Sequence, residues 1–197
     1  MDNKKVNRKK RKVIFLLLLS LMSIATYAQK ASLKTNLLYG ATTTPNLAFE
    51  IGLSDKTSVE LSVGYNPWEF ADNKKLKHYL IQPEFRWWFC ETFNGLFLGA
   101  HLLGGEYNMA KIKLPFGIYK SLQDYRYEGY FYGGGISLGN QWLLNSRWSI
   151  EAYIGLGYVR THFDKYPCEE CGKRIKSDDR NYFGPTKVGI SLIYYLW

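Results

Sequence analysis

Apolar and polar residues alternate along most of this 197-residue chain. Val59, Leu61 and Val63, for example, are separated by single polar residues. Because successive side chains of a β-strand point to opposite faces, this period of two predicts strands with one apolar face and one polar or small face. The pattern recurs in eight segments, which cover residues 32–39, 46–53, 57–66, 78–89, 95–105, 129–142, 148–160 and 186–197. The chain is therefore predicted to be all-β.

The connections between these segments alternate in length. Short connections cover residues 54–56, 91–94 and 143–147, and longer ones cover residues 40–45, 67–77, 106–128 and 161–185. Transmembrane barrels have short periplasmic turns and longer extracellular loops, and their tilted strands need about 9–11 residues to cross the hydrocarbon layer. We therefore predict an eight-stranded antiparallel up-and-down transmembrane β-barrel. Because Pro83 has no N–H to donate to the ladder, we expect a bulge or local irregularity there.

The first 28 residues have the pattern of a secretory signal peptide. Basic residues cluster between Lys4 and Lys12, an apolar run extends from Val13 to about Ile24, and small residues precede a cleavage position after Ala28. The apolar run is shorter than the ~20 residues of a membrane-spanning helix. We expect residues 1–28 to be cleaved, residues 29–197 to form one barrel domain, and the product to reach the bacterial outer membrane.

The high positive charge belongs mostly to this signal. Its removal takes away seven of the 26 basic and one of the 17 acidic residues. The 19 basic and 16 acidic residues that remain give a net charge of +3 in place of +9. A concentrated basic surface is therefore absent from the expected mature sequence, and we predict no nucleic-acid partner.

One face of the alternating pattern carries charged residues. A sheet can cross lipid only if it closes and its outer face is apolar, so we assign the charged face to the lumen. The expected lumen cluster consists of Lys34, Glu50, Glu60, Glu84, Arg86, His101, Glu151 and Lys187. An eight-stranded lumen is just wide enough to be filled by side chains, and buried charges there must pair. We interpret the cluster as a structural polar core, and the alternative is an acid–base set of Glu84, Arg86, His101 and Glu151.

Aromatic residues mark the predicted strand ends and the last strand. Trp68, Trp87, Trp88, Trp142 and Trp148 lie near strand ends, as in the aromatic girdles of membrane barrels. The last strand resembles an outer-membrane assembly signal in its residues Lys187, Gly189, Leu192, Tyr194 and Trp197. We expect the barrel-assembly machinery to read this signal during insertion.

Cys168 and Cys171 stand three positions apart in the connection 161–185. Four chemistries are open to the pair: a loop disulfide, a redox pair, half of a zinc site, or two free thiols. The oxidising surroundings of an exported protein favour the disulfide. No thioredoxin-like pattern surrounds the pair, and zinc would need two further ligands, of which only His162 is near. Cys90 is left unpaired.

The connection 106–128 combines aromatic rings with cations. It holds Tyr107, Phe116, Tyr119, Tyr125 and Tyr127 together with Lys111, Lys113, Lys120 and Arg126. Function often resides in loops on a rigid scaffold, and this composition suits contact with a partner protein, a glycan or the phosphates of lipopolysaccharide. It equally suits a solvated surface loop.

Three stretches of the chain resemble a known family. They are KTNLLY at residues 34–39, CEECG at residues 168–172 and GPTKVGISLIY at residues 184–194. Together they resemble a bacterial family catalogued only as a domain of unknown function, number 3575, and the resemblance extends over nearly all of the expected mature chain. The resemblance implies a small outer-membrane protein of the Bacteroidota, in some cases encoded beside fimbrial components. It implies no activity.

We therefore expect a non-enzymatic outer-membrane barrel whose surface loops bind or organise a cell-envelope partner, with fimbrial assembly or anchoring as the leading role. Outer-membrane lipid and lipopolysaccharide are further expected partners, and no catalytic residue, cofactor or metal is expected. The alternative is a lipid-modifying barrel enzyme, an acyltransferase or deacylase, which needs a nucleophile and a histidine near the membrane interface. His162 is the only candidate base, and no convincing Ser–His pair is evident in the sequence.

Overall fold

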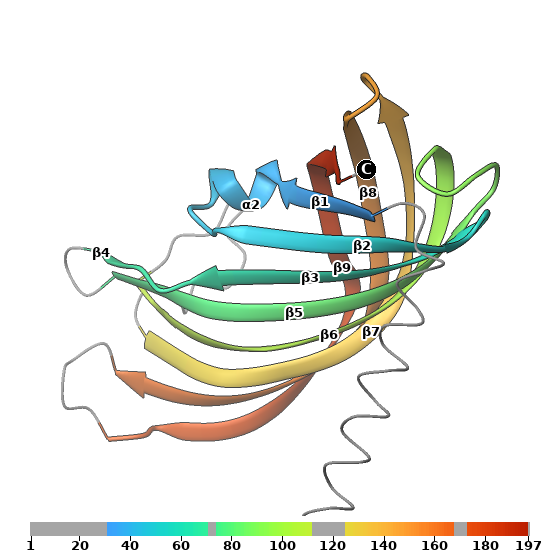
Figure 1. Ribbon diagram of the computed structural model, residues 1–197. Helices are drawn as coiled ribbons and strands as arrows, with labels where there is room; N and C mark the ends of the chain where they lie inside the picture. The colour runs from blue at the N-terminus through green and yellow to red at the C-terminus, as the bar shows by residue number, and fades with distance from the viewer. Residues whose placement is uncertain (1–30, 71–73, 112–124, 168–172, 197) are drawn as a thin grey trace, which may run out of the picture.

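The structure, a computed structural model, describes residues 31–70, 74–111, 125–167 and 173–196 (Figure 1). Its strands are β1 (Ala31–Asn36), β2 (Asn46–Ser54), β3 (Thr57–Asn66), β4 (Glu69–Phe70), β5 (Lys74–Trp88), β6 (Gly95–Ala110), β7 (Tyr125–Leu143), β8 (Trp148–Pro167) and β9 (Lys176–Tyr195), and the short helix α2 (Leu37–Ala41) follows β1. The expected signal peptide, residues 1–28, lies outside the described residues. Within the described ranges, no helix has the length and apolar character needed to cross a membrane.

Eight strands of the described part form one closed antiparallel sheet. Each of these strands pairs with its neighbours in chain order. The ring closes where β1 pairs with β9, for example with Ser32 opposite Tyr195. β3 pairs directly with β5, beginning with Thr57 opposite Trp87, so the two-residue β4 only extends the edge of β5. The predicted eight-stranded up-and-down barrel is confirmed.

The alternation in the sequence becomes an apolar outer face and a polar inner face. On the outer face, the side chains of Leu61, Ile136 and Ile154 are 48, 63 and 54 % exposed. On the inner face, Glu60 and Ser137 are buried directly beside them in sequence. This order is the inverse of that in water-soluble proteins, whose charged residues are mostly exposed and whose large apolar residues are mostly buried.

The first strand is shorter than predicted. It ends at Asn36, whose side-chain oxygen accepts a hydrogen bond from the backbone N–H of Leu38 at 3.0 Å. This contact caps α2, because the first N–H groups of a helix need acceptors from outside the helix. The prediction that residues 37–39 continue the strand was therefore wrong.

The later strands are longer than predicted. Residues 106–128 and 161–185 were expected to be loops, but β6 and β8 extend into them, and β7 and β9 begin within them. Cross-strand pairs of rings hold these extensions together: Tyr127 and Phe163 lie 5.6 Å apart, and Tyr130 stacks on His162 at 5.3 Å. We call residues 161–167 and 176–180 the β8–β9 extension. It continues the sheet beyond the shorter strands β1, β2 and β3 (Figure 1).

The strands contain one ladder gap and one bulge near the middle of the barrel. Pairing of β5 with β6 stops after Ile81 and resumes at Glu84 in the same register, so Pro83 produces a gap in the ladder and no bulge. Shifts in register lie elsewhere: one near the end of β2, between Gly52 and Ser54, and one between β8 and β9, where Thr186 is the extra residue of β9. A bulge of this kind re-aims a side chain, and Thr186 contacts the lumen residue His101.

Apolar side chains fill one end of the lumen. Trp88, Phe93, Phe97, Ile193 and Tyr195 form a cluster of buried residues there. The rings of Trp88 and Phe97 lie 4.9 Å apart, and the indole N–H of Trp88 donates to the Ser58 hydroxyl at 2.8 Å. Trp88 is therefore a lumen residue, and its assignment to an outer girdle was wrong. Its neighbour Trp87 is exposed on the outer face, because adjacent residues of a strand point in opposite directions.

Candidate functional site

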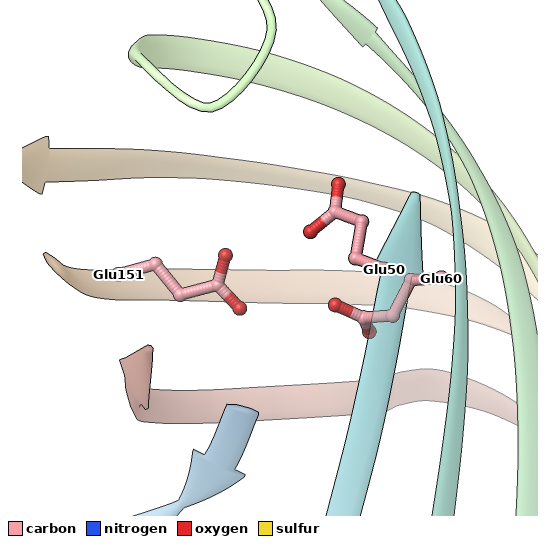
Figure 2. A group of neighbouring side chains, drawn as sticks. All are labelled: Glu50, Glu60 and Glu151. Carbon is pink, nitrogen blue, oxygen red and sulfur yellow. The ribbon is translucent and has the colours of Figure 1, made fainter. Parts of the chain in front are cut away.

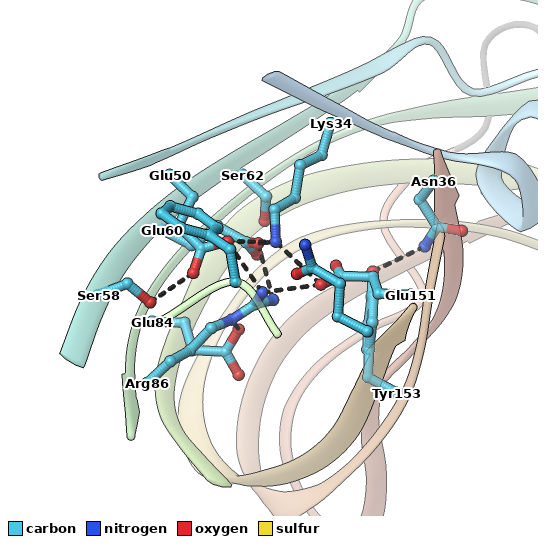
Figure 3. Close-up of polar contacts among 12 residues, drawn as sticks. Lys34, Asn36, Glu50, Ser58, Glu60, Ser62, Glu84, Arg86, Glu151 and Tyr153 are labelled. Atoms are coloured by element: carbon cyan, nitrogen blue, oxygen red, sulfur yellow. Dashed lines mark hydrogen bonds and ion pairs between the residues drawn. The ribbon is translucent and has the colours of Figure 1, made fainter. Parts of the chain in front are cut away.

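The structure places the eight charged or titratable residues of the expected lumen cluster inside the barrel. Figure 3 labels six of them: Lys34, Glu50, Glu60, Glu84, Arg86 and Glu151. They come from seven strands: Lys34 from β1, Glu50 from β2, Glu60 from β3, Glu84 and Arg86 from β5, His101 from β6, Glu151 from β8 and Lys187 from β9. Among the ring strands of the described part, β7 alone contributes none of these eight residues. Burial of this kind requires a partner for each charge, since an unpaired buried charge costs several kcal/mol. All eight side chains are buried.

Arg86 lies at the centre of the cluster. Its guanidinium nitrogens are 3.1 Å from Glu50, 2.7 Å from Glu60, 2.8 Å from Glu84 and 3.0 Å from Glu151. One side chain of β5 therefore joins β2, β3 and β8. A planar guanidinium with five donors suits such multiple contacts with carboxylates better than an ammonium group does.

Two lysines neutralise the same carboxylates from other strands. The Lys34 Nζ is 3.2 Å from Glu60 and 2.9 Å from Glu151. The Lys187 Nζ is 2.9 Å from Glu60 and 2.5 Å from Glu84. With Arg86, three cations meet the four carboxylates of the cluster, and each of the seven charges has at least one opposite partner.

Three of these carboxylates, from Glu50, Glu60 and Glu151, lie close enough together to be considered as metal ligands (Figure 2). One oxygen from each lies within 4.8 Å of the others. Lys34 and Arg86, however, each contact all three carboxylates. The chain itself thus supplies the positive charge between them, and the arrangement is that of an ion-paired core.

His101 lies at the edge of the cluster. Its Nε2 is 2.8 Å from the hydroxyl of Thr186, the residue that the bulge adds to β9. A void beside Lys34 and Tyr153 has a volume of about 20 Å³, which is room for a single water molecule. The geometry favours the structural interpretation of the cluster over the acid–base one, because a lumen filled in this way offers a substrate little space.

Gly189 permits close packing beside the cluster. A Cβ atom at this position would lie 2.3 Å from the Tyr153 hydroxyl and 2.6 Å from the side-chain nitrogen of Asn36. We predict that Gly189→Ala lowers the free energy of unfolding by about 1–3 kcal/mol, because Tyr153 must move. Urea unfolding in detergent micelles measures the change. Gly40→Ala is the matched control, since its Cβ would meet no atom within 4 Å, and equal stabilities of the two variants would contradict the prediction.

The residues of the expected assembly signal divide between the two faces of β9. Lys187 and Gly189 are buried in the lumen, whereas Leu192 and Tyr194 alternate with them on the outer face. The ring of Tyr194 packs on that of Trp148 at 5.0 Å. Trp197 lies outside the described residues, and recognition by the assembly machinery stays a prediction.

The expected loop disulfide also lies outside the described residues, because it joins Cys168 and Cys171. Among the described residues, Cys90 has a free and exposed thiol. Four of the residues expected to form a binding loop, Phe116, Tyr119, Lys113 and Lys120, lie outside the described residues as well.

The β8–β9 extension brings together three residues whose proximity was not predicted. The Nδ1 of His162 is 2.6 Å from Asp179, and its Nε2 is 3.4 Å from the Ser177 hydroxyl. β9 was predicted to begin at Thr186, so Ser177 was not assigned to a strand. Its position opposite β8, near His162, could therefore not be predicted. No convincing Ser–His pair was evident in the sequence, because the length of the strand that places Ser177 beside His162 was not predicted.

Neighbouring charges set the ionisation of Asp179. Arg160 donates a hydrogen bond to one carboxylate oxygen at 2.8 Å, and the His162 Nδ1 hydrogen-bonds to the other oxygen. The hydrogen bond from Arg160, followed by that from His162, holds the pKa of Asp179 below its ordinary value. With Asp179 ionised, the proton of the neutral imidazole is favoured on Nδ1, which leaves Nε2 free to accept one.

The fold and the lumen together define a closed eight-stranded antiparallel barrel with an apolar exterior and an ion-paired interior. The chain belongs to the family described as "Protein of unknown function (DUF3575)", whose sequence profile matches residues 13–196. The family resemblance noted in the sequence is thus confirmed. No curated protein and no solved structure matches the chain.

Proposed function

We propose that this chain is a bacterial outer-membrane barrel, exported through a signal cleaved after Ala28, whose projecting hairpins bind or organise a cell-envelope partner. The observation that carries the proposal is the apolar outer face. Leu47, Leu98, Leu138 and Val188, from four different strands, are between 43 and 56 % exposed. Monomeric soluble proteins rarely expose contiguous apolar patches of more than a few hundred Å², whereas lipid requires such a surface.

The height of the apolar face supports a position in the membrane. On β8 it runs from Trp148 to Tyr158, and on β7 from Tyr132 to Trp142. Each run rises by about ten residues, which at about 3.3 Å per residue and a tilt of about 40° spans about 25 Å. That is the height of the apolar band of outer-membrane barrels, and exposed aromatic side chains mark both of its edges.

The filled lumen favours a role at the surface over a role as a pore. Beyond the barrel, the projecting hairpins carry cations stacked on aromatic rings. The Lys165 Nζ lies 3.5 Å from the centre of the Tyr125 ring, and the Arg126 guanidinium lies 4.7 Å from that of Tyr166. Rings and cations of this kind suit a protein surface, a glycan or the phosphates of lipopolysaccharide.

Cell fractionation tests the position in the membrane. We expect the processed chain to begin at Gln29, to sediment with the outer membrane and to need detergent for release. Its mobility in an electrophoresis gel should change on heating, as the closed barrel unfolds. Recovery of the processed chain from the periplasm without detergent would overturn the proposal.

Photocrosslinking in whole cells tests the binding role. A photoreactive residue replaces Tyr166 on the projecting hairpin, and the matched control carries it at Leu144, in the turn at the other end of the barrel. We expect the variant at position 166 to capture a surface protein, and the family resemblance makes a fimbrial subunit the leading expectation. Identical products at the two positions would contradict a partner specific to the hairpins.

A further inference from the structure

Ser177, His162 and Asp179 form a line of hydrogen-bonding groups on one face of the β8–β9 extension. His162 bridges the other two, with Nδ1 2.6 Å from Asp179 and Nε2 3.4 Å from Ser177. The ring of Tyr130 stacks on the imidazole with the two planes 26° apart, which restricts its rotation. A hydroxyl, an imidazole and a carboxylate in this order are the constellation of serine hydrolases, and such contacts are often loose before substrate binds.

This line of groups lies just beyond the apolar outer face. The outward positions of β8 run from Leu156 and Tyr158 to Arg160 and then His162. Tyr158 is 48 % exposed, and Phe183, opposite it on β9, is 80 % exposed. Ser177 lies opposite Asp164, six residues beyond Tyr158 on β8. If the barrel takes the proposed membrane position, the Ser177 hydroxyl lies outside the hydrocarbon layer, on the side of the lipid headgroups.

A groove bordered by Tyr130 offers room for a ligand. Its volume is about 560 Å³, and its lining includes Tyr65, Tyr79, Glu106 and Tyr130. Tyr130 connects the groove to the reactive groups, because the same ring stacks on His162. The volume falls within the range of about 300–1,000 Å³ that is usual for small-molecule sites, and the tyrosine rings suit an acyl chain or a sugar.

We propose that the β8–β9 extension is a hydrolytic site for acyl esters of membrane lipids, with Ser177 as nucleophile, His162 as general base and Asp179 as the residue that positions the imidazole. This activity departs from the sequence-based expectation of a non-enzymatic barrel and goes beyond the binding role proposed above. Its lipid substrate class rests on the proposed membrane position.

The reaction follows from the order of the groups. The Ser177 Oγ attacks the carbonyl carbon of the ester while its proton passes to the His162 Nε2. The bond from that carbon to the alcohol oxygen then breaks, and the alcohol leaves with the proton from His162. Water next loses a proton to His162 and attacks the acyl group on Ser177. The fatty acid leaves, Ser177 recovers its proton, and the balance is one ester and one water converted into one acid and one alcohol.

Ser177 has a second neighbour in the structure. Its hydroxyl also hydrogen-bonds to Asp164, which lies directly opposite it on β8. A substrate entering the site must therefore turn the hydroxyl from Asp164 toward His162.

Covalent labelling of the full chain, refolded in detergent micelles, tests the nucleophile. We expect a fluorophosphonate probe to label Ser177, as identified by mass spectrometry of the peptides. Ser177→Ala should lose the label, and His162→Gln should label at least about a hundred-fold more slowly. Ser146→Ala, in the turn at the opposite end of the barrel, is the matched control and should label as the unmodified chain does.

Two further arms test the positioning residue and the substrate. Asp179→Glu should retain more labelling than Asp179→Asn, an order that a merely structural role would not produce. Phospholipid vesicles and lipopolysaccharide, offered separately, should show which source releases fatty acid. Absence of label on Ser177 in protein that shows the heat-dependent gel shift, or equal ester hydrolysis by Ser177→Ala, would overturn the site. A labelled chain that fractionates as soluble would overturn only the membrane position and the lipid substrate.

Discussion

Arg86→Met should lower the free energy of unfolding by about 3–5 kcal/mol, the cost typical of removing one partner from a buried ion pair. The guanidinium contacts Glu50, Glu60, Glu84 and Glu151, and the methionine would leave two buried lysines to neutralise four carboxylates. Urea unfolding in detergent micelles, followed by tryptophan fluorescence, measures the loss.

Arg147→Met is the control for the loss of an arginine as such. Arg147 is exposed in the turn before β8, where its guanidinium lies 3.4 Å from the Tyr194 hydroxyl. Its replacement should change the free energy of unfolding by no more than about 0.5 kcal/mol, as is usual for surface positions. Similar losses for the two variants would mean that the lumen network does not hold the strands together.

The lumen cluster could be located from the sequence because it needs only the alternation of side chains. Glu60 and Lys187 stand far apart in the chain, yet each is charged and occupies the face opposite a row of apolar residues. Which cation meets which carboxylate could not be derived, since that depends on the stagger of the strands around the ring. The contact of Lys187 with both Glu60 and Glu84 is therefore a result of the structure alone.

The incorrect prediction for Trp88 and the missed β8–β9 extension also have physical causes. Trp88 was assigned to the outer face from its nearness to a strand end, although its parity with Arg86 places it inside. The β8–β9 extension was missed because residues 176–182, KSDDRNY, show no alternation of apolar and polar side chains. Cross-strand contacts such as Arg160 with Asp179 hold that segment as a strand, and a single sequence does not reveal such pairs. The Ser177 site depended on this register and was missed with it.

Ile136→Arg should lower the free energy of unfolding in lipid vesicles by about 2–4 kcal/mol, the cost of a basic residue near the middle of a bilayer. Ile136 lies on the outer face of β7 between Tyr132 and Trp142, and its side chain is 63 % exposed. In water, a charge at a position with this exposure would carry little cost. The direction and magnitude of the change in the free energy of unfolding therefore show whether lipid or water surrounds the outer face. Urea unfolding of the protein inserted in vesicles measures this change.

Leu144→Arg separates the effect of lipid from the effect of the substitution. Leu144 is 60 % exposed, almost as much as Ile136, but it lies in the turn beyond the aromatic edge that Trp142 and Trp148 mark. Its replacement by arginine should cost no more than about 1 kcal/mol, because the penalty falls steeply toward the membrane surface. If Ile136→Arg and Leu144→Arg were equally tolerated, the apolar outer face would have to be covered by something other than lipid, since an apolar surface of this extent is not stable in water.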